Sequence, residues 1–246
     1  TGKAGYKAHI SLALSVAPDR PVRPLGVLSF EPVFRTAPPR SKSKKKHSGA
    51  ETARWKNKEY ARWKRGIETA GKSLAGHPSV IHVADREADC FELFYLIERL
   101  NQGFVIRLRT DRRARLNHEA EDEDEDDYDW STLGKLASQM KGVCVKEVPL
   151  SKRGAKRAPA SLKTHPPRES RSALLHFDAV QVEIPKPRYV SEGPATLQVG
   201  LVRVWEPHPP AGEQPVEWLL FTNEPCDTAD AMIRVVDLYR CRWMIE

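Results

Sequence analysis

Residues 80–108, VIHVADREADCFELFYLIERLNQGFVIRL, contain the alternation that decides the fold class. Val80–Ala84 is a short apolar run, which predicts a strand that ends at Asp85. Gly103–Leu108 predicts a second strand. Between them, Ala88–Leu100 predicts a helix, because apolar side chains recur on or near one side at Cys90, Phe91, Phe94, Ile97 and Leu100. A strand, a helix and a strand with short connections predict two parallel strands joined by a right-handed crossover.

The segments before this unit predict a hairpin and a long helix. Tyr6–Val16 and Leu25–Phe34 read as strands, and the three prolines between them favour an antiparallel turn. Glu51–Leu74 has helical spacing, with one apolar face formed by Trp63, Ile67, Ala70 and Leu74. Trp55 and Trp63 lie among basic residues, a pattern found in nucleic-acid binding, although core tryptophans with exposed lysines are commoner.

The segments after this unit predict more strands and a last helix. The helix spans Asp227–Glu246, and Asp227 or Thr228 can cap its start. Four strand-like runs precede it, separated by loops rich in proline, glycine and basic residues: Val143–Leu150, Ala173–Ile184, Ala195–Trp205 and Val216–Thr222. The middle of the chain is therefore predicted to be β-rich and flanked by α/β segments.

The charge of the chain is unevenly distributed. The formal net charge is +7, but residues 119–129 contain nine acidic groups, and the rest of the chain carries +16. Such a basic surface favours polyanions, because bound Lys and Arg release counterions from phosphates; general solubility is the alternative. The acidic run Glu119–Asp129 is predicted to be a solvated loop, and the basic run Ser41–His47 a loop that can touch a DNA backbone.

Membrane and zinc-binding classes find no support in the sequence. No run approaches the roughly 18 apolar residues of a membrane helix, and no signal peptide is evident. None of the four cysteines forms a CxxC pair, which argues against a zinc knuckle. Scattered thiols favour a reducing compartment, so we expect a cytoplasmic protein.

Two places carry residues suited to chemistry. Asp85 follows a strand directly, where ligands bind in open α/β sheets, so its carboxylate suits a metal ligand. The alternative is that Asp85 or Glu87 favours the N-terminus of the next helix. In LYRCRWMIE, Tyr239, Arg242 and Glu246 are three and four residues apart and share one helix face. An ordinary Arg–Glu pair would explain part of this spacing, and packing is expected on the opposite side at Ile233, Leu238 and Ile245.

Taken together, VADREAD at 83–89 and Y-x-x-R-x-x-x-E at 239–246 resemble the DDE-type transposases of the hairpin-forming insertion-sequence-four family. The resemblance implies that Asp85 and Glu246 are catalytic carboxylates that bind metal, and that Tyr239 and Arg242 hold DNA phosphates near the cut. GFVIRLRT at 103–110 is similar to a strand of that family and implies that Arg107 lies near the DNA end. EWLLFTNEP at 217–225 is similar to another, so Trp218 is expected to stack on a flipped base, with a core tryptophan as the alternative.

The resemblance also implies a fold and a mechanism. It predicts an α/β, ribonuclease-H-like core of the retroviral-integrase type, formed by residues 1–110 and 216–246 and interrupted by a β-rich insertion at 111–215. Two Mg²⁺ or Mn²⁺ ions would serve cleavage and strand transfer at transposon ends. The expected partners are double-stranded DNA, as transposon ends and target, and a second copy in a homodimer of the full-length protein; no membrane is expected, and the protein is placed in the bacterial cytoplasm, at the nucleoid when bound to DNA.

The sequence departs from the family pattern at both ends. The first catalytic aspartate has no counterpart, since Asp19 is the only aspartate in the first 84 residues and lies in a predicted turn. The lysine expected beyond Glu246 is also absent. We therefore expect a truncated central fragment, lacking the first strand of the core, that neither cuts nor joins DNA. A DNA-binding remnant without chemistry, another ribonuclease-H-like nuclease and an unrelated α/β protein are the alternatives.

Overall fold

The computed structural model describes residues 7–17, 20–33, 49–117, 130–154 and 167–245, with the backbone alone for residue 7 and residues 49–59. The fold is mixed α/β. The predicted loops at 41–47 and 119–129, the side chain of Trp55 and Glu246 lie outside these residues.

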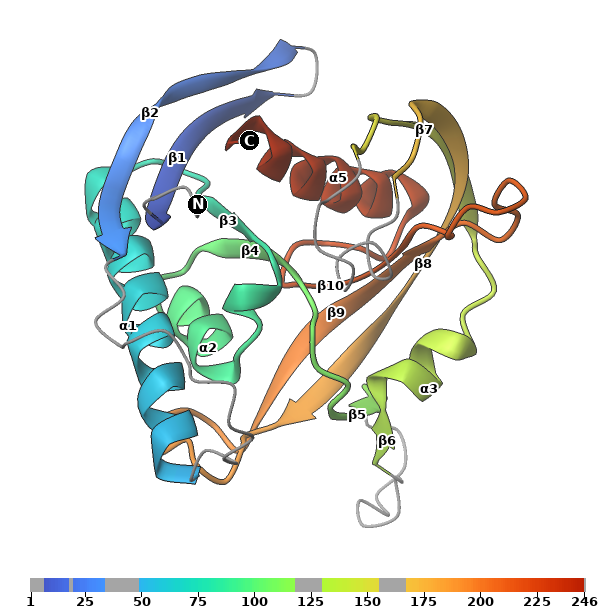
Figure 1. The fold of residues 1–246 in the computed structure, drawn as a ribbon. Helices are drawn as coiled ribbons and strands as arrows, with labels where there is room; N and C mark the ends of the chain where they lie inside the picture. The colour runs from blue at the N-terminus through green and yellow to red at the C-terminus, as the bar shows by residue number, and fades with distance from the viewer. Residues whose placement is uncertain (1–6, 18–19, 34–48, 118–129, 155–166, 246) are drawn as a thin grey trace, which may run out of the picture.

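A mixed eight-stranded sheet forms the centre of the described part of the chain (Figure 1). Its strands follow the order β3-β4-β10-β9-β8-β5-β6, and β7 pairs with β8 beside this path. β3 and β4 are parallel, as the sequence predicts, and the other pairs are antiparallel. The strands span Ile81–Ala84 (β3), Gly103–Arg107 (β4), Arg113–Leu116 (β5), Ser131–Thr132 (β6), Cys144–Leu150 (β7), Arg171–Pro185 (β8), Thr196–Trp205 (β9) and Glu217–Thr222 (β10).

Helices cover both faces of this sheet. Helix α2 (Phe91–Arg99) packs on one face in a cluster that includes Phe104 and Ile106 of β4. Helix α5 (Ala229–Arg240) packs on the other face in a cluster that includes Val105 of the same strand. Successive side chains of a strand point to opposite faces. The three central residues of β4, Phe104, Val105 and Ile106, are all apolar because both faces of this strand are covered.

A separate hairpin and a long helix lie beside the sheet. Strands β1 (Lys7–Ala17) and β2 (Arg20–Val33) pair antiparallel, as predicted, but β2 begins earlier than expected and includes two of the prolines of the predicted turn. Helix α1 (Gly49–Ser73) packs against this hairpin, and in Figure 1 the hairpin rises beside α1 and curves toward the C-terminal end of the chain. Ile67 and Ala70 are buried in α1, which confirms the predicted apolar face.

Three short elements were not predicted. They are β5, β6 and helix α3 (Leu133–Ser138). The sequence of β5 is RARL, in which the arginines leave no clear run of apolar residues. β6 has two residues and α3 has six. Elements this short carry too little periodicity to be recognised, and tertiary pairing with β8 places β5.

The last helix differs from its prediction. Thr228 caps α5 by accepting a hydrogen bond from the backbone N–H of Ala231 at 3.2 Å, as predicted. However, the α-helix ends at Arg240, and Cys241–Ile245 continues as a 3₁₀ helix, η2. The tighter turn changes the angular spacing of side chains, so the predicted continuous α-helical face does not extend to residue 245.

The strands of residues 111–215 continue the sheet that β3, β4 and β10 form. The buried cluster around α2 likewise contains residues of both regions, such as Phe104 and Leu201. The division at residues 110 and 215 stays a prediction, as does the ribonuclease-H-like identity of the core. None of the helices in the described part of the chain combines the length and apolar character needed to cross a bilayer.

Candidate functional site

Asp85 is the first residue after β3 and faces an open groove. It stands at the N-cap position of a 3₁₀ turn, η1 (Arg86–Ala88), but its side chain forms no capping hydrogen bond. Its side chain is 40% exposed. Asp85 therefore does not cap η1 through its side chain, and its carboxylate contacts Tyr239 and Arg242 instead, whereas Glu87 does stand in the first turn of η1.

Asp89, four residues later, fixes the loop that presents Asp85. Its side chain is 1% exposed, and its carboxylate accepts hydrogen bonds from the backbone N–H groups of Arg109 at 2.7 Å and Thr110 at 2.9 Å. Arg112 also contacts this carboxylate through its guanidinium. Arg109 and Thr110 follow β4, so Asp89 joins the segments that leave the carboxyl ends of two parallel strands.

Tyr239 of α5 contacts Asp85 through its hydroxyl. Its hydroxyl donates a hydrogen bond to Asp85 Oδ1 at 3.4 Å, and its ring centroid lies 5.5 Å from that of Trp218. Burial raises the pKa of Tyr239, and the nearby positive charge of Arg107 opposes that rise. Tyr239 is fully buried, and its hydroxyl orients Asp85 in this structure; its expected contact with a DNA phosphate stays a prediction.

Two arginines complete the group around Asp85. Arg242 Nη2 lies 3.9 Å from Asp85 Oδ2. Arg107, at the end of β4, donates a long hydrogen bond of 3.4 Å to the carbonyl of Glu217, next to Trp218. The residues that meet here come from four parts of the chain, and the fold brings them to one edge of the sheet: Asp85 after β3, Arg107 on β4, Trp218 on β10, and Tyr239 and Arg242 on α5 and η2.

The predicted polar stripe on the last helix is wrong in one respect. Tyr239 belongs to the buried face of α5, together with Val235 and Val236, whereas Ile245 is 43% exposed. The reason is that a tyrosine ring is apolar apart from its hydroxyl, so it packs on the sheet and directs that hydroxyl at Asp85. Glu246 lies outside the described residues, so its predicted place beside Asp85 stays a prediction.

The groove in front of Asp85 has a volume of about 1840 Å³ and runs between the hairpin β1–β2, the end of β3, the start of β10 and the end of α5. Its basic lining residues outnumber the acidic ones. The acidic residues are Asp85, Glu87 and Glu217. The basic residues are Arg86, Arg107, Arg109, Lys152, Arg153, Arg168, Arg234, Arg240 and Arg242. A concave surface with this excess of cations attracts polyanions.

Several of these cations were not predicted as site residues. Lys152, Arg153 and Arg168 belong to basic loops between predicted strands, and only the pairing of β7 with β8 shows that these loops meet. The available signal was that both loops flank consecutive strand-like runs, since consecutive strands usually pair.

Trp63 packs against the core, and its ring centroid lies 4.4 Å from that of His9. This position supports the interpretation of Trp63 as a core tryptophan over a role in nucleic-acid binding.

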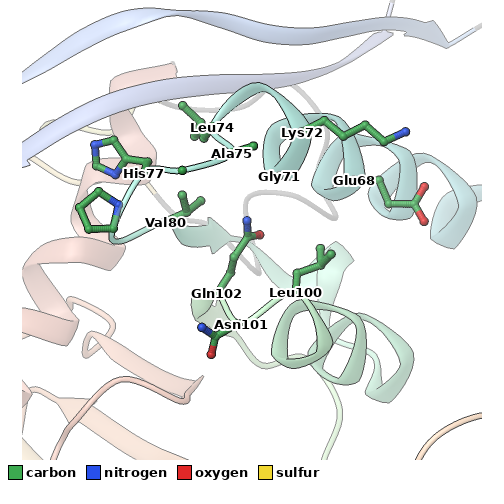
Figure 2. Close-up of a pocket in the computed structure, with 12 residues that line it drawn as sticks. Glu68, Gly71, Lys72, Leu74, Ala75, His77, Val80, Leu100, Asn101 and Gln102 are labelled. Carbon is green, nitrogen blue, oxygen red and sulfur yellow. The ribbon is translucent and has the colours of Figure 1, made fainter.

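A second, smaller pocket of about 660 Å³ lies between the ends of α1 and α2 (Figure 2). It contains none of the predicted site residues. Gln102, which points into it in Figure 2, has its side-chain oxygen 2.7 Å from Nε2 of the part-buried His82. The side chain of Gln102 is thus engaged within the protein, and the groove at Asp85, which contains the predicted residues, is the stronger candidate site.

No protein-family model matches this sequence. Within the described ranges, no group of three or more His, Cys, Asp or Glu side chains is arranged to hold a metal ion. The functional interpretation therefore depends on the residues that converge at Asp85 and on the charge of the groove.

Proposed function

We propose that this protein binds DNA in the groove and belongs to the transposase class that performs metal-dependent cleavage and strand transfer at phosphodiesters. The observation that carries the proposal is the convergence of Asp85, Arg107, Trp218, Tyr239 and Arg242 at one sheet edge. Those residues were selected from sequence patterns that lie far apart, and a chance resemblance gives no reason for them to meet.

The donor chemistry at Asp85 fits a magnesium ion. Its carboxylate is a hard oxygen ligand, is partly exposed and forms no capping hydrogen bond. Asp85 would hold the metal together with Glu246, as the resemblance implies. Bound metal ions of this kind activate the attacking water or 3′-hydroxyl and stabilise the leaving oxygen.

The remaining residues of the site bind and position. Arg107 and Arg242 supply guanidinium groups that match phosphate oxygens. Trp218 is partly exposed at the groove and offers a ring face to an unstacked base. Tyr239 positions Asp85 and Trp218, because its hydroxyl donates a hydrogen bond to Asp85 and its ring packs beside Trp218.

The test measures binding of a fluorescently labelled 30-base-pair duplex with and without Mn²⁺ at constant ionic strength. We expect Mn²⁺ to tighten binding by the unaltered protein about 3- to 10-fold and to have no such effect on Asp85→Ala. Glu87→Ala is the matched control, since Glu87 is an exposed acid of the same groove, and it should respond like the unaltered protein. An identical response of all three proteins would remove the metal-ligand role of Asp85.

The second candidate function is DNA binding without chemistry. It is favoured by the position of Arg242, whose guanidinium already gives Asp85 a counter-charge at 3.9 Å. Salt-sensitive binding that ignores both Mn²⁺ and Asp85→Ala would select this function. Nicking of a supercoiled plasmid that requires Mg²⁺ or Mn²⁺ and is lost in Asp85→Ala would select the enzyme.

A further inference from the structure

Arg153 and Arg168 face each other at the base of the connection between β7 and β8. They form an isolated antiparallel bridge, with backbone hydrogen bonds of 2.7 Å and 2.9 Å between their N–H and carbonyl groups. Side chains of such a directly opposed pair point to the same side of the ladder, with Cα atoms about 5.5 Å apart. Both side chains line the groove that contains Asp85.

The carboxylates near Arg153 and Arg168 form ion pairs with other cations. Glu206 and Glu213 both pair with Arg171, and Glu169 pairs with Lys152 at 3.0 Å. Among the described residues, no carboxylate forms an ion pair with Arg153 or Arg168. The two Nε atoms are buried and have no hydrogen-bond partner there, and Arg168 uses Nη2 to reach the carbonyl of Ser151 at 2.9 Å.

Two adjacent guanidinium groups that share no carboxylate repel one another and lose hydration. Burial and the positive charges of Arg153 and Arg171 lower the pKa of the Arg168 guanidinium, against the opposing charges of Glu213 and Glu206. Buried donors without partners cost free energy, and an anion between the two groups would satisfy them. A phosphate suits this arrangement, because its oxygens accept several N–H bonds from guanidinium groups at once.

We propose that Arg153 and Arg168 form a phosphate site that anchors the DNA backbone on the β7–β8 side of the groove, away from Asp85. This inference rests on the proposed function, because it assumes DNA in that groove. It adds a contact that the sequence patterns around Asp85 and Tyr239 do not include. The site positions DNA and carries no sequence information, as backbone contacts do.

The experiment compares Arg153→Gln/Arg168→Gln with Arg99→Gln/Arg188→Gln, a control that removes the same charge from exposed positions outside the groove. Affinity for the labelled duplex is measured from 50 to 300 mM NaCl. We expect the site variant to lose about 10- to 100-fold in affinity and to reduce the slope of log K against log salt by about two, one for each phosphate contact. The control should change affinity less than about 3-fold.

Separate outcomes distinguish this inference from the proposed function. If the site variant binds like the control while the Mn²⁺ response still depends on Asp85, the phosphate site is wrong and the proposed function stands. If the unaltered protein does not bind DNA, both fail. Titration with inorganic phosphate tests whether the anion is DNA or a free phosphate. If the unaltered protein binds inorganic phosphate at micromolar concentration, Arg153→Gln/Arg168→Gln abolishes that binding, and the DNA affinity of this variant is unchanged, then the site binds a free anion and the backbone contact is wrong.

The melting temperature tests whether the two arginines are instead structural. A structural role would lower the melting temperature of the site variant, whereas we expect it to stay the same or rise.

Discussion

At the scale of single residues, two aspartates of one motif have opposite roles. Asp85 is partly exposed, faces the groove and contacts Tyr239, whereas Asp89 is buried and accepts hydrogen bonds from the backbone after β4. The motif at 83–89 alone does not separate them. Burial does, because a fully enclosed and hydrogen-bonded carboxylate has no room for a ligand.

Replacement of Asp89 should therefore damage folding. We expect Asp89→Ala to lower the free energy of unfolding by about 3–5 kcal/mol, because it leaves Arg112 and two backbone N–H groups without their acceptor. Urea denaturation followed by circular dichroism measures this. Glu87→Ala, an exposed acid two residues away, should change stability by less than about 0.5 kcal/mol. Equal effects of the two substitutions would show that Asp89 does not hold the loop.

At the scale of elements, close contact between β9 and the start of α5 leaves no space at Gly200. A Cβ atom at this position would lie 2.5 Å from Cys226 Sγ and 3.2 Å from Thr222 Cγ2. Cys226 is buried, two residues before the Thr228 cap of α5. Gly200 thus sets how closely β9 approaches the segment that carries Tyr239 to the site.

We expect Gly200→Ala to destabilise the protein by about 1–3 kcal/mol through overpacking. Thermal unfolding of Gly200→Ala, Cys226→Ala and the double variant measures the effect and its cause. The double variant should be less destabilised than the sum of the single variants, because removal of the sulfur makes room for the methyl group. Gly154→Ala is the control, since no atom of the described residues lies within 4 Å of its Cβ position. Strict additivity would exclude the contact with Cys226 as the cause.

At the scale of the whole molecule, part-buried histidines and paired carboxylates make stability depend on pH in one direction. Burial lowers the pKa of His9 and His82 below 6.5, against opposing effects of Glu31 and Gln102. The guanidinium of Arg171 lowers the pKa of Glu206 below 4.5, and Arg65 does the same for Glu31. In both cases the unfolded chain binds protons more readily than the folded protein, so acid favours unfolding.

We expect stability to fall in two stages as the pH decreases. The first begins near pH 6.5, where the unfolded histidines take up protons while the folded ones remain neutral. The second begins near pH 4.5, where the unfolded glutamates are protonated and the folded ones still carry charge. Urea denaturation from pH 8 to 4 measures both stages. His9→Gln/His82→Gln should remove the first stage and keep the second. If the first stage persists in this variant, other titratable groups cause it.

Much of the fold follows from local pattern. The parallel pair β3–β4, the hairpin β1–β2, the buried face of α1 and the cap at Thr228 were all predicted, because each depends on periodicity or on one turn of chain. The short elements β5, β6 and α3 and the 3₁₀ ending of α5 were not. β5 and β6 form because neighbouring strands pair with them, while α3 and the 3₁₀ turn are too short to carry a recognisable period.

Local sequence pattern identified the residue types available for chemistry: a carboxylate directly after a strand, an arginine and a tryptophan on predicted strands, and a Tyr–Arg spacing on the last helix. The tertiary structure was needed to show that Tyr239 is buried, that Arg153 and Arg168 face the groove, and that five residues meet: Asp85, Arg107, Trp218, Tyr239 and Arg242. The difference arises from the range over which each interaction acts. Periodicity and capping act over a few residues, whereas burial and the distance between charges depend on strands that pair across more than one hundred residues of chain.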